Sequence, residues 1–537
     1  MSYLKNFINR KITPQTEPIP GKPQVENSAG GYSFAVDDWA RLDRFLILGS
    51  ENGSFYASEK KLTAENAEAV IRCITTDGLR TIARIVEISE AGRAPKNEPA
   101  ILALALASVH GDVPTRRAVG EALPRVCRIG THLFHFAQYV DAMRGWGRGL
   151  RRAVANWYVN ASAQDVAYQA VKYQQREGWS HRDLLRLSHP IAPSDDHNVV
   201  FNWITQGWPG IGDEPHPVKA AQVIWALERA RTADKAEIIK LITDYRLPRE
   251  VLPTQWLSDP DVWATLLPHM GLTAMIRNLG NMSKIGLLSD GNRQTVDFVA
   301  NSITSADQLR RARIHPVAVL AAMLTYKQGH GMRGKGEWTP VTRVIDALDA
   351  AFYKAFGNVT PSGQRMLLAL DVSGSMGGGQ IAGVQGLSPR VGSAAMALVT
   401  AATEQDYRIM GFASQLVPIN VSPRQRLDDV IKTVSAIPMG GTDCALPMLW
   451  ALENKVETDT FVVYTDSETW FGKIHPVQAL TQYREKTGIP AKLVVVGMTS
   501  NGFTIADPAD AGMMDVVGFD TATPQVISDF AKERLAN

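Results

Sequence analysis

Five side chains in the last third of the chain have the types and spacing that could bind one divalent cation. Asp371, Ser373 and Ser375 form Asp-Val-Ser-Gly-Ser directly after an apolar run, so one carboxylate and two hydroxyls can converge on one point. Thr442 lies in Gly-Gly-Thr-Asp, and Asp466 follows a second apolar run. All five offer oxygen, which suits Mg²⁺ first, with Ca²⁺ or Mn²⁺ as alternatives, rather than zinc. The alternative is a degenerate site that binds no metal.

Short β-rich runs that alternate with helical stretches must position these groups. The runs are 365–371, 406–413, 460–466, 491–498 and 513–519. Strands that are buried on both faces and alternate with helices predict a doubly wound, mainly parallel, Rossmann-like α/β sheet. In such sheets ligands collect at the carboxyl ends of the strands, where Asp371 and Asp466 stand. We therefore expect an α/β domain at 362–537, after a linker at 357–364.

Residues 362–537 resemble the von Willebrand factor A-type domain. The five oxygen ligands match the metal-ion-dependent adhesion site of that family. The resemblance implies that the metal keeps one coordination position for an acidic group of a partner. One departure is the Gly-rich insertion at 377–390, which we expect to cover the site or to shape its partner face.

The chain before the linker has a different pattern. Residues 1–30 are rich in Pro, Gln, Asn and Gly and show no periodicity, which predicts a loose N-terminal arm. Residues 31–357 are helical in pattern and almost free of strand signals; Trp39, Leu42 and Phe45, for example, fall on one helix face. Many helices without a sheet indicate a solenoid of helix pairs rather than one bundle. We expect a multidomain protein, an all-α HEAT-like helical-repeat domain followed by the α/β domain.

Composition limits the class of protein. The chain has 537 residues with 45% hydrophobic and 20% charged residues, typical of a globular protein with more than one domain. No apolar run is long enough to cross a bilayer, and the N-terminus has no apolar signal core. Its 3 cysteines lie far apart, which suits a reducing compartment. We expect a cytoplasmic monomer that makes no membrane contact.

Positive charge is concentrated in one window. Residues 114–186 hold 12 Lys and Arg against 5 Asp and Glu, whereas residues 361–537 hold 13 against 18. Such a footprint favours a polyanionic partner, although basic clusters are also common as plain solvated surface. Both interpretations stay open at this point.

Several long stretches before the linker resemble the Ro autoantigen family, the proteins of Ro ribonucleoproteins. The stretches are 37–56, 143–158, 172–190, 272–282 and 314–338. The resemblance implies a helical-repeat TROVE module that closes into a ring, followed by an A-type domain. It also implies binding of small noncoding Y RNA outside the ring, and of 3′ ends of misfolded or immature structured RNAs in its hole. A 3′ exoribonuclease is an implied partner, and the expected role is a scaffold, not an enzyme.

Ten basic residues in or near the basic window are the candidate RNA ligands. They are Arg144, Arg148, Arg151, Arg152, Lys172, Arg176, His181, Arg182, Arg186 and His189. The first four are spaced as one stripe on a helix, and Lys172 and Arg176 repeat the i, i+4 spacing. Ser180 and Asp183 predict a helix start, which leaves His181 in the first turn, either to contact RNA or simply to occupy the turn. Guanidinium groups bind phosphate through two hydrogen bonds.

Other residues carry weaker alternatives. The aromatic residues of the window favour core packing over base stacking; they are Trp146, Trp157, Trp179, Tyr158 and Tyr173. His132 and His135 lack a third ligand, so packing is favoured over metal binding. His330 and Arg333 lie in a Gly-rich basic loop, and the sequence leaves open whether this loop lines the hole. A second function is a metal-dependent protein-docking scaffold without a direct RNA role. A hydrolase is a third and weaker possibility, since no general base is evident.

Overall fold

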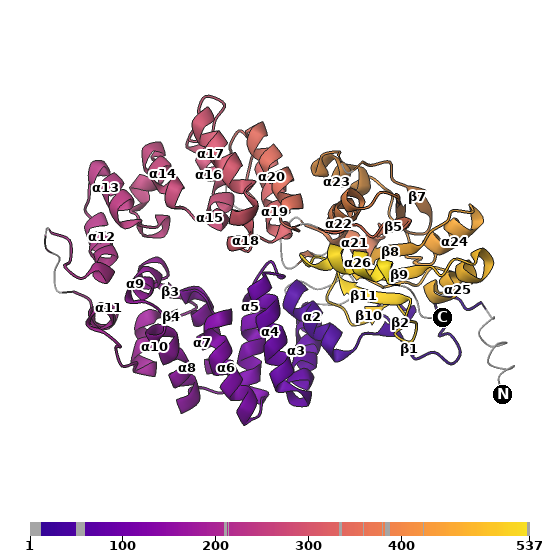
Figure 1. The fold of residues 1–537 in the computed structure, drawn as a ribbon, viewed down its shortest axis with the longest axis horizontal. Helices are drawn as coiled ribbons and strands as arrows, with labels where there is room; N and C mark the ends of the chain where they lie inside the picture. The colour runs from indigo at the N-terminus through magenta and orange to yellow at the C-terminus, as the bar shows by residue number, and fades with distance from the viewer. Residues whose placement is uncertain are drawn as a thin grey trace.

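The chain folds into a helical part and an α/β part that lie side by side (Figure 1). The computed structural model describes residues 12–49, 59–208, 212, 214–331, 336–357, 359–378, 380–381, 387–422 and 424–533, without the side chains of 59–64. Among these residues, no helix has both the length and the apolar character needed to span a bilayer. The predicted order of a helical domain followed by an α/β domain is confirmed.

Consecutive helices form the first part. They are α2 (Asp38–Leu48), α3 (Glu59–Thr76), α4 (Gly78–Ala91), α5 (Glu98–His110), α6 (Val113–Val126), α7 (Gly130–Met143), α8 (Arg148–Val159), α9 (Ala163–Lys172), α10 (His181–Ser188), α11 (Asp195–Gln206), α12 (Gln222–Ala230), α13 (Lys235–Tyr245), α14 (Pro260–Leu266), α15 (Leu272–Arg277), α16 (Leu279–Lys284), α17 (Arg293–Ile303), α18 (Ala306–Arg311), α19 (Pro316–Lys327) and α20 (Thr342–Lys354). Several begin at a side chain that caps the free N–H groups, as Asp112 does for α6 and Ser162 for α9. Each packs an apolar face against its neighbours; in α8 that face is Leu150, Val154 and Trp157.

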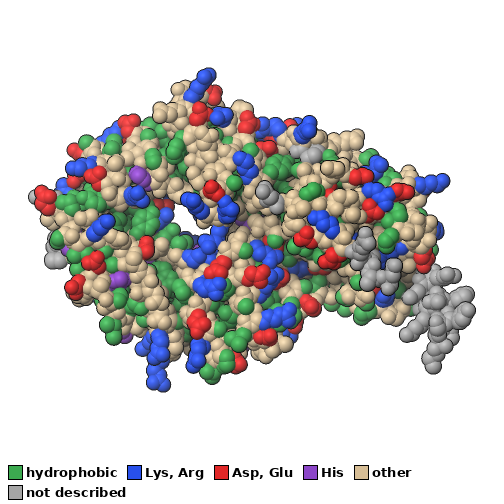
Figure 2. Space-filling view, viewed as in Figure 1, with side chains coloured by type: hydrophobic (Ala, Val, Ile, Leu, Met, Phe, Trp, Pro, Cys, Tyr) green, Lys and Arg blue, Asp and Glu red, His purple; other side chains and the backbone are tan. Residues whose placement is uncertain are grey.

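The two ends of this helical layer meet, so that it closes into a ring around a hole (Figures 1 and 2). We call the meeting point the seam; there the turn before α19 contacts the last turn of α4 and the segment after it. Arg313 Nε donates a hydrogen bond of 2.7 Å to the carbonyl of Glu90, and the His315 ring nitrogen Nε2 lies 2.9 Å from the carbonyl of Arg93. The short hairpin of β3 (Gln175–Arg176) and β4 (Trp179–Ser180) interrupts the helices, and the sequence did not predict it.

A six-stranded sheet forms the centre of the second part, in the order β11-β9-β8-β5-β6-β7. Its strands are β5 (Met366–Asp371), β6 (Tyr407–Phe412), β7 (Leu416–Pro418), β8 (Thr460–Thr465), β9 (Lys492–Gly497) and β11 (Met513–Val517). All neighbours are parallel except β6 and β7. The helices are α21 (Gly374–Gly377), α22 (Pro389–Thr403), α23 (Leu427–Ser435), α24 (Leu446–Glu453), α25 (Pro476–Thr487) and α26 (Thr523–Lys532). Alternate residues of β5 face opposite cores, Leu368 with the core that continues into the ring and Leu367 with the core of α24 and α25. The five predicted strands are all present.

Residues 12–35 pack against the α/β domain, so the prediction of a loose N-terminal arm is wrong for the residues that the structure describes. Within this arm, β1 (Gln24–Glu26) and β2 (Tyr32–Ala35) form an antiparallel sheet with β10 (Phe503–Thr504). Ile19 and Phe34 are buried in the core that contains α24 and α25. The Pro-, Gln- and Asn-rich composition conceals this order because several of the arm's contacts are hydrogen bonds of polar side chains, such as those of Gln15 and Asn27.

Candidate cation site and candidate RNA interface

Asp371 and Asp466 lie at the carboxyl ends of the neighbouring parallel strands β5 and β8, as predicted. Both side chains are buried. Asp371 accepts hydrogen bonds from Thr465 Oγ1 at 2.7 Å and from the Ser373 N–H at 2.9 Å, and Asp466 accepts one from the Glu468 N–H at 3.0 Å. Burial and the nearby charge of Asp466 raise the pKa of Asp371 to about 7, and burial also raises the pKa of Asp466.

The three predicted hydroxyl ligands lie at the same edge of the sheet. Ser373 Oγ and Ser375 Oγ are 3.1 Å apart and buried. Thr442 is 1% exposed, and its Oγ1 has no hydrogen-bond partner among the residues that the structure describes. The carbonyl of Thr442 accepts hydrogen bonds of 3.1 Å from the N–H groups of Trp470 and Phe471, which hold its loop beside the end of β8.

This set of residues fits a hard divalent cation. Two buried carboxylates repel each other, and a buried hydroxyl without a partner costs about 1–3 kcal/mol. A cation bound between these groups would remove both penalties. Cys444 lies nearby, with Sγ 3.7 Å from Thr465 Oγ1, but burial raises the pKa of its thiol well above the usual range. The chemistry therefore favours oxygen ligation by Mg²⁺, Ca²⁺ or Mn²⁺ over a thiolate metal site.

Arg390, in the first turn of α22, holds the backbone of the Asp371–Ser375 loop from behind. Its side chain is buried, and Nη2 donates hydrogen bonds to the carbonyls of Val372 and, at 3.1 Å, Ser373. Our sequence interpretation missed this residue, although an arginine at the start of a buried helix was a possible signal. Residues 379 and 382–386 of the Gly-rich insertion before it lie outside the described residues, so the predicted role of the insertion stays a prediction.

The N-terminal arm holds the loop on the other side of the site. Gln15 is fully buried, and its Nε2 donates a hydrogen bond of 2.7 Å to Asp443 Oδ1. Ser33 Oγ donates one of 3.0 Å to the carbonyl of Ser467. Glu468 is buried two residues beyond Asp466 and accepts a hydrogen bond from the backbone of the arm. Burial and the Asp466 charge raise the pKa of Glu468 to about 7.

The predicted RNA ligands of α8 form a shorter stripe than expected. Arg148, Arg151 and Arg152 are exposed on the side of α8 that faces away from the core. Arg144 does not belong to that helix, because it ends α7 and its guanidinium donates to the carbonyl of Ser108. The prediction of one four-residue stripe is wrong, since the chain leaves the helical path between Arg144 and Arg148.

Lys172 and Arg176 are not on one helix either. Lys172 is the last residue of α9, and its ammonium group lies 5.7 Å from the centre of the Tyr168 ring and 5.4 Å from that of Tyr173. Arg176 lies in the hairpin that follows, where it is exposed and forms an ion pair of 3.2 Å with Glu177. The helical i, i+4 relation is therefore wrong, although both cations stay in the same connecting region.

The α10 segment agrees with its predicted local structure. Ser180 and Asp183 form the expected capping box at the helix start. Arg182 and Arg186 are exposed and four residues apart, hence on one face. His189 is exposed and ends the helix in the left-handed region, with φ 46°. The structure therefore places these three side chains at the surface.

His181 lies in the core, so the prediction that its side chain contacts RNA is wrong. The imidazole is 3% exposed and its Nδ1 is 2.8 Å from the hydroxyl of Tyr158. The ring stacks near Trp157, with centroids 6.1 Å apart, and meets the edge of Phe134. Burial lowers the pKa of His181 to about 3. The neutral ring thus fixes α10 against α8 and α7.

The structure decides between packing and ligand binding for several of the aromatic residues and histidines named in the sequence analysis. Trp157 is buried, its Nε1 donates to the carbonyl of Cys127 at 2.6 Å, and Trp146 packs on Trp179 with centroids 5.7 Å apart. Packing is thus confirmed for these three tryptophans. His135 is buried, and burial lowers the pKa of His132 to about 4; the described residues hold no cluster of three metal-ligating His, Cys, Asp or Glu side chains. Arg333 lies outside the described residues, and His330 is exposed.

A cavity of about 560 Å³ opens in the wall of the ring beside the seam. Lys96, Arg277 and Arg313 line it, together with apolar residues that include Ile276 and Trp338. Lys and Arg side chains also border the hole in the view of Figure 2. Arg277 and Lys96 were not among the predicted RNA ligands, because neither belongs to the basic window of the sequence.

Protein-family comparisons divide the chain in the same way as the fold. Residues 25–208 and 244–325 match the TROVE domain, and residues 365–531 match the Ro60 vWA domain. Similar proteins include the RNA-binding protein RO60 of Deinococcus radiodurans, 44% identical over 99% of both chains. Another is the RNA-binding protein RO60 of Caenorhabditis elegans, 35% identical over 95% of this chain and 90% of that one.

A solved structure supports the same assignment. The crystal structure of the Deinococcus radiodurans RO (RSR) protein matches with a TM-score of 0.70 and 44% identity, and it covers 92% of this chain and 99% of that one. The helical ring, the domain order and the sequence similarity along almost the whole chain all point to one family. The chain belongs to the Ro60 family of RNA-binding scaffold proteins, which join a TROVE domain to a vWA domain.

Proposed function

We propose that this protein is a Ro ribonucleoprotein scaffold that binds a small structured noncoding RNA of the Y type on the outside of its ring. One observation carries this proposal: Arg148, Arg151, Arg152, Arg182 and Arg186 are exposed, and none pairs with a carboxylate among the residues that the structure describes. Basic side chains lie along the outer edge of the ring near α8 and α10 in Figure 2. Guanidinium groups without acidic partners are available for phosphate.

The hole of the ring is proposed to bind the single-stranded 3′ ends of misfolded or immature structured RNAs. The support is the cavity beside the seam, in which Lys96, Arg277 and Arg313 surround an apolar wall. Such a combination suits a single strand, whose phosphates need cations and whose unstacked bases need apolar or aromatic contacts.

The experiment that tests RNA binding begins with the protein as it is purified from cytoplasm, where we expect it to act as a monomer. Absorbance near 260 nm that RNase removes is the expected result. The bound RNA is then sequenced, and structured small RNAs and 3′-extended or misfolded RNAs should be enriched. Protein free of RNA from its own cells, with no affinity for added structured RNA, would contradict the proposal.

The cation site is proposed to bind Mg²⁺, with Asp371, Ser373, Ser375, Thr442 and Asp466 as the residues that would hold it. When bound, the cation would supply positive charge and accept an acidic group from a partner. Thr465 orients the Asp371 carboxylate through its 2.7 Å hydrogen bond, and Arg390 fixes the loop backbone. These supporting interactions are expected to tune metal affinity.

A second candidate function is protein docking at the cation site. Two large apolar side chains are exposed beside the loop that carries Thr442, Met439 at 64% and Phe471 at 51%. Met439 lies beside the backbone of Gly377, and Phe471 lies beside the backbone of Gly441. Because these glycines are close in sequence to Ser375 and Thr442, both apolar side chains flank the site. A partner that depends on divalent cations, resists RNase and dissociates on chelation would support docking. A 3′ exoribonuclease is the partner proposed for that test.

A further inference from the structure

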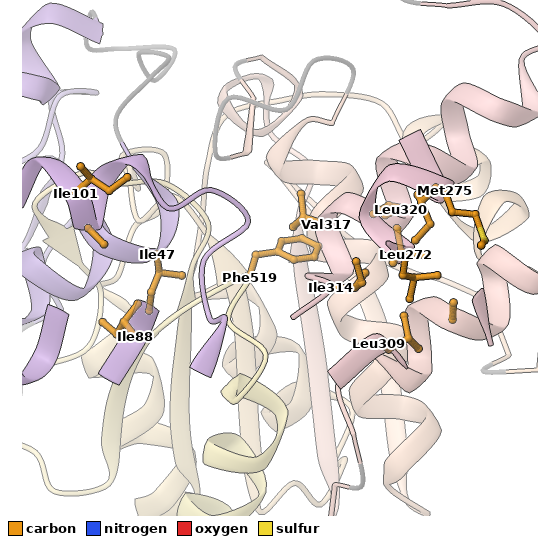
Figure 3. Close-up of a cluster of buried hydrophobic side chains, with 14 of the residues drawn as sticks. Ile47, Ile88, Ile101, Leu272, Met275, Leu309, Ile314, Val317, Leu320 and Phe519 are labelled. Atoms are coloured by element: carbon orange, nitrogen blue, oxygen red, sulfur yellow. The ribbon is translucent and has the colours of Figure 1, made fainter. Parts of the chain in front are cut away.

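A short loop of the α/β domain inserts at the seam of the helical ring. The loop is residues 518–520, between β11 and α26. Phe519 is 1% exposed, and Figure 3 shows its ring between Ile47 and Ile88 on one side and Ile314 and Val317 on the other. The first pair comes from α2 and α4, and the second from the segment that begins α19. Phe519 thus belongs to the same hydrophobic core as these residues from both ends of the ring.

Polar contacts of the same loop reinforce the insertion. Asp520 is almost fully buried and accepts a hydrogen bond of 2.6 Å from Nε of Arg93 in the segment after α4. The carbonyl of Arg93 in turn contacts His315 Nε2 from the other end of the ring at 2.9 Å. Arg93 thus connects Asp520 to the seam itself, and an ion pair with a buried carboxylate is sensitive to loss of either partner.

The α/β domain also holds the two flanks of the seam separately. On the first flank, Arg44 of α2 forms an ion pair of 2.7 Å with Asp515 of β11. On the last flank, Lys327 of α19 pairs with Asp428 of α23. Among the described residues, the direct hydrogen bonds between the two ends of the ring are those of Arg313 and His315. Ring closure therefore depends on the second domain as well as on the ring.

We propose that Phe519 and Asp520 act as a clasp: they hold the two ends of the ring together, and the closed ring admits only RNA that has a free end. The first half of the proposal, closure of the ring by the clasp, concerns the protein alone and is independent of RNA. The second half rests on the proposed binding of single-stranded RNA in the hole. A closed ring cannot pass around a strand whose two ends are both blocked, so such an RNA enters only after the seam opens.

The clasp is tested by the distance across the seam in the full-length protein. Exposed Ala83 of α4 and Ala306 of α18 are changed to cysteine and spin-labelled; the native cysteines are buried. The parent is expected to show one narrow distance distribution, and Phe519→Ala with Asp520→Asn a longer and broader one. Asn keeps an oxygen for the hydrogen bond from the Ala522 N–H but removes the charge that pairs with Arg93. Distributions that coincide with the parent's would overturn the clasp.

Two further variants distinguish an opened seam from a general folding defect. Phe530 lies in α26, the helix that follows the loop, and its ring faces Lys492 of β9; Phe530→Ala removes a ring of the same size and should leave the distance unchanged. Arg93→Gln keeps the core intact and should broaden the distribution by itself. Circular dichroism shows which variants are folded. If Phe530→Ala opens the ring as much as the clasp variant does, the effect is not specific to the seam and the clasp is rejected.

The free-end requirement is tested with a single-stranded RNA that carries biotin at one or both ends, capped by streptavidin. The parent should bind the singly capped RNA and exclude the doubly capped RNA by at least tenfold. The clasp variant should bind both within a factor of about two. Equal binding of both RNAs by the parent would overturn the free-end requirement. Binding of neither by the parent would overturn the proposed role of the hole, while the label distances still decide the clasp.

Discussion

Thr465 Oγ1, at the end of β8, donates a hydrogen bond of 2.7 Å to Asp371 Oδ2, at the end of β5. The bond joins the two strands at the edge where the predicted cation ligands converge. The other Asp371 oxygen, Oδ1, accepts a hydrogen bond from the Ser373 N–H. Hydrogen bonds from the end of β8 and from the loop after β5 therefore orient both oxygens of this carboxylate. We expect a carboxylate fixed in this way to bind a cation without rearrangement.

Asp371→Ala is expected to abolish binding of Mg²⁺, because it removes one of the two carboxylates that supply negative charge. Thr465→Val should weaken binding by roughly 10–100-fold, the usual effect of removing a group that orients a metal ligand. Calorimetric titration with Mg²⁺ measures both variants. A gel-shift with structured RNA serves as the control and should stay near normal. If Asp371→Ala binds Mg²⁺ as the parent does, the cation is not held at this site.

Affinity for structured RNA is expected to fall as salt rises, because we propose that the exposed arginines of α8 and α10 contact phosphates. The logarithm of the association constant should fall linearly with the logarithm of salt concentration, by roughly 0.9 for each duplex phosphate contacted. Arg148→Gln with Arg151→Gln should reduce this slope. Filter binding at several salt concentrations gives the slopes. A response that does not change with salt would exclude phosphate contacts as the main source of affinity.

Arg182→Gln with Arg186→Gln is expected to weaken binding of a Y-like structured RNA by roughly 1–3 kcal/mol, the usual cost of removing well-formed polar interactions. Lys172→Ala with Arg176→Ala should have a similar effect. A short single-stranded RNA that enters the hole should be affected much less. Arg310→Gln is the matched control, since Arg310 is an exposed arginine of α18 far along the chain from this surface. An equal decrease in the control would show that general charge, and not this surface, binds the RNA.

The stability of the ring is expected to decrease in mild acid because of buried neutral histidines. Burial lowers the pKa of His181 to about 3, against about 6.5 in an unfolded chain, so the unfolded state binds more protons between these values. The free energy of unfolding should therefore fall as the pH drops below about 6.5. In His181→Gln the fall should be less steep by up to about 1.4 kcal/mol per pH unit. Urea midpoints at pH 7.5, 6 and 5 test this, and parallel slopes would contradict it.

Sequence periodicity was sufficient to predict the strands of the α/β domain because these strands are buried on both faces. Apolar runs such as 460–466 are evident in the sequence, and the residue after such a run stands at the ligand-binding edge. Asp371 and Asp466 were located for that reason. The short edge strand β7 and the arm strands β1 and β2 were missed, since each is held by only a few backbone hydrogen bonds and lacks an apolar run.

Helical spacing was less reliable for the RNA ligands because it assumes that a helix continues. Arg144 and Arg176 fall beyond helix ends, where the chain turns and the i, i+4 rule no longer holds. His181 looked like a surface residue in a polar first turn, yet its ring fills space between Trp157 and Tyr158. Contacts between segments that are distant in sequence, such as Phe519 at the ring seam, leave no local pattern in the sequence.

Crosslinking is the measurement that tests the two RNA surfaces most directly. The full-length protein is irradiated with a structured RNA that has a single-stranded 3′ end, and crosslinked peptides are identified by mass spectrometry. The duplex portion should crosslink within residues 144–189. The 3′ end should crosslink to the wall of the hole, at residues 273–281 or 313–326. Crosslinks confined to the rim of the cation site, around Met439 and Phe471, would contradict the account and favour the docking function instead.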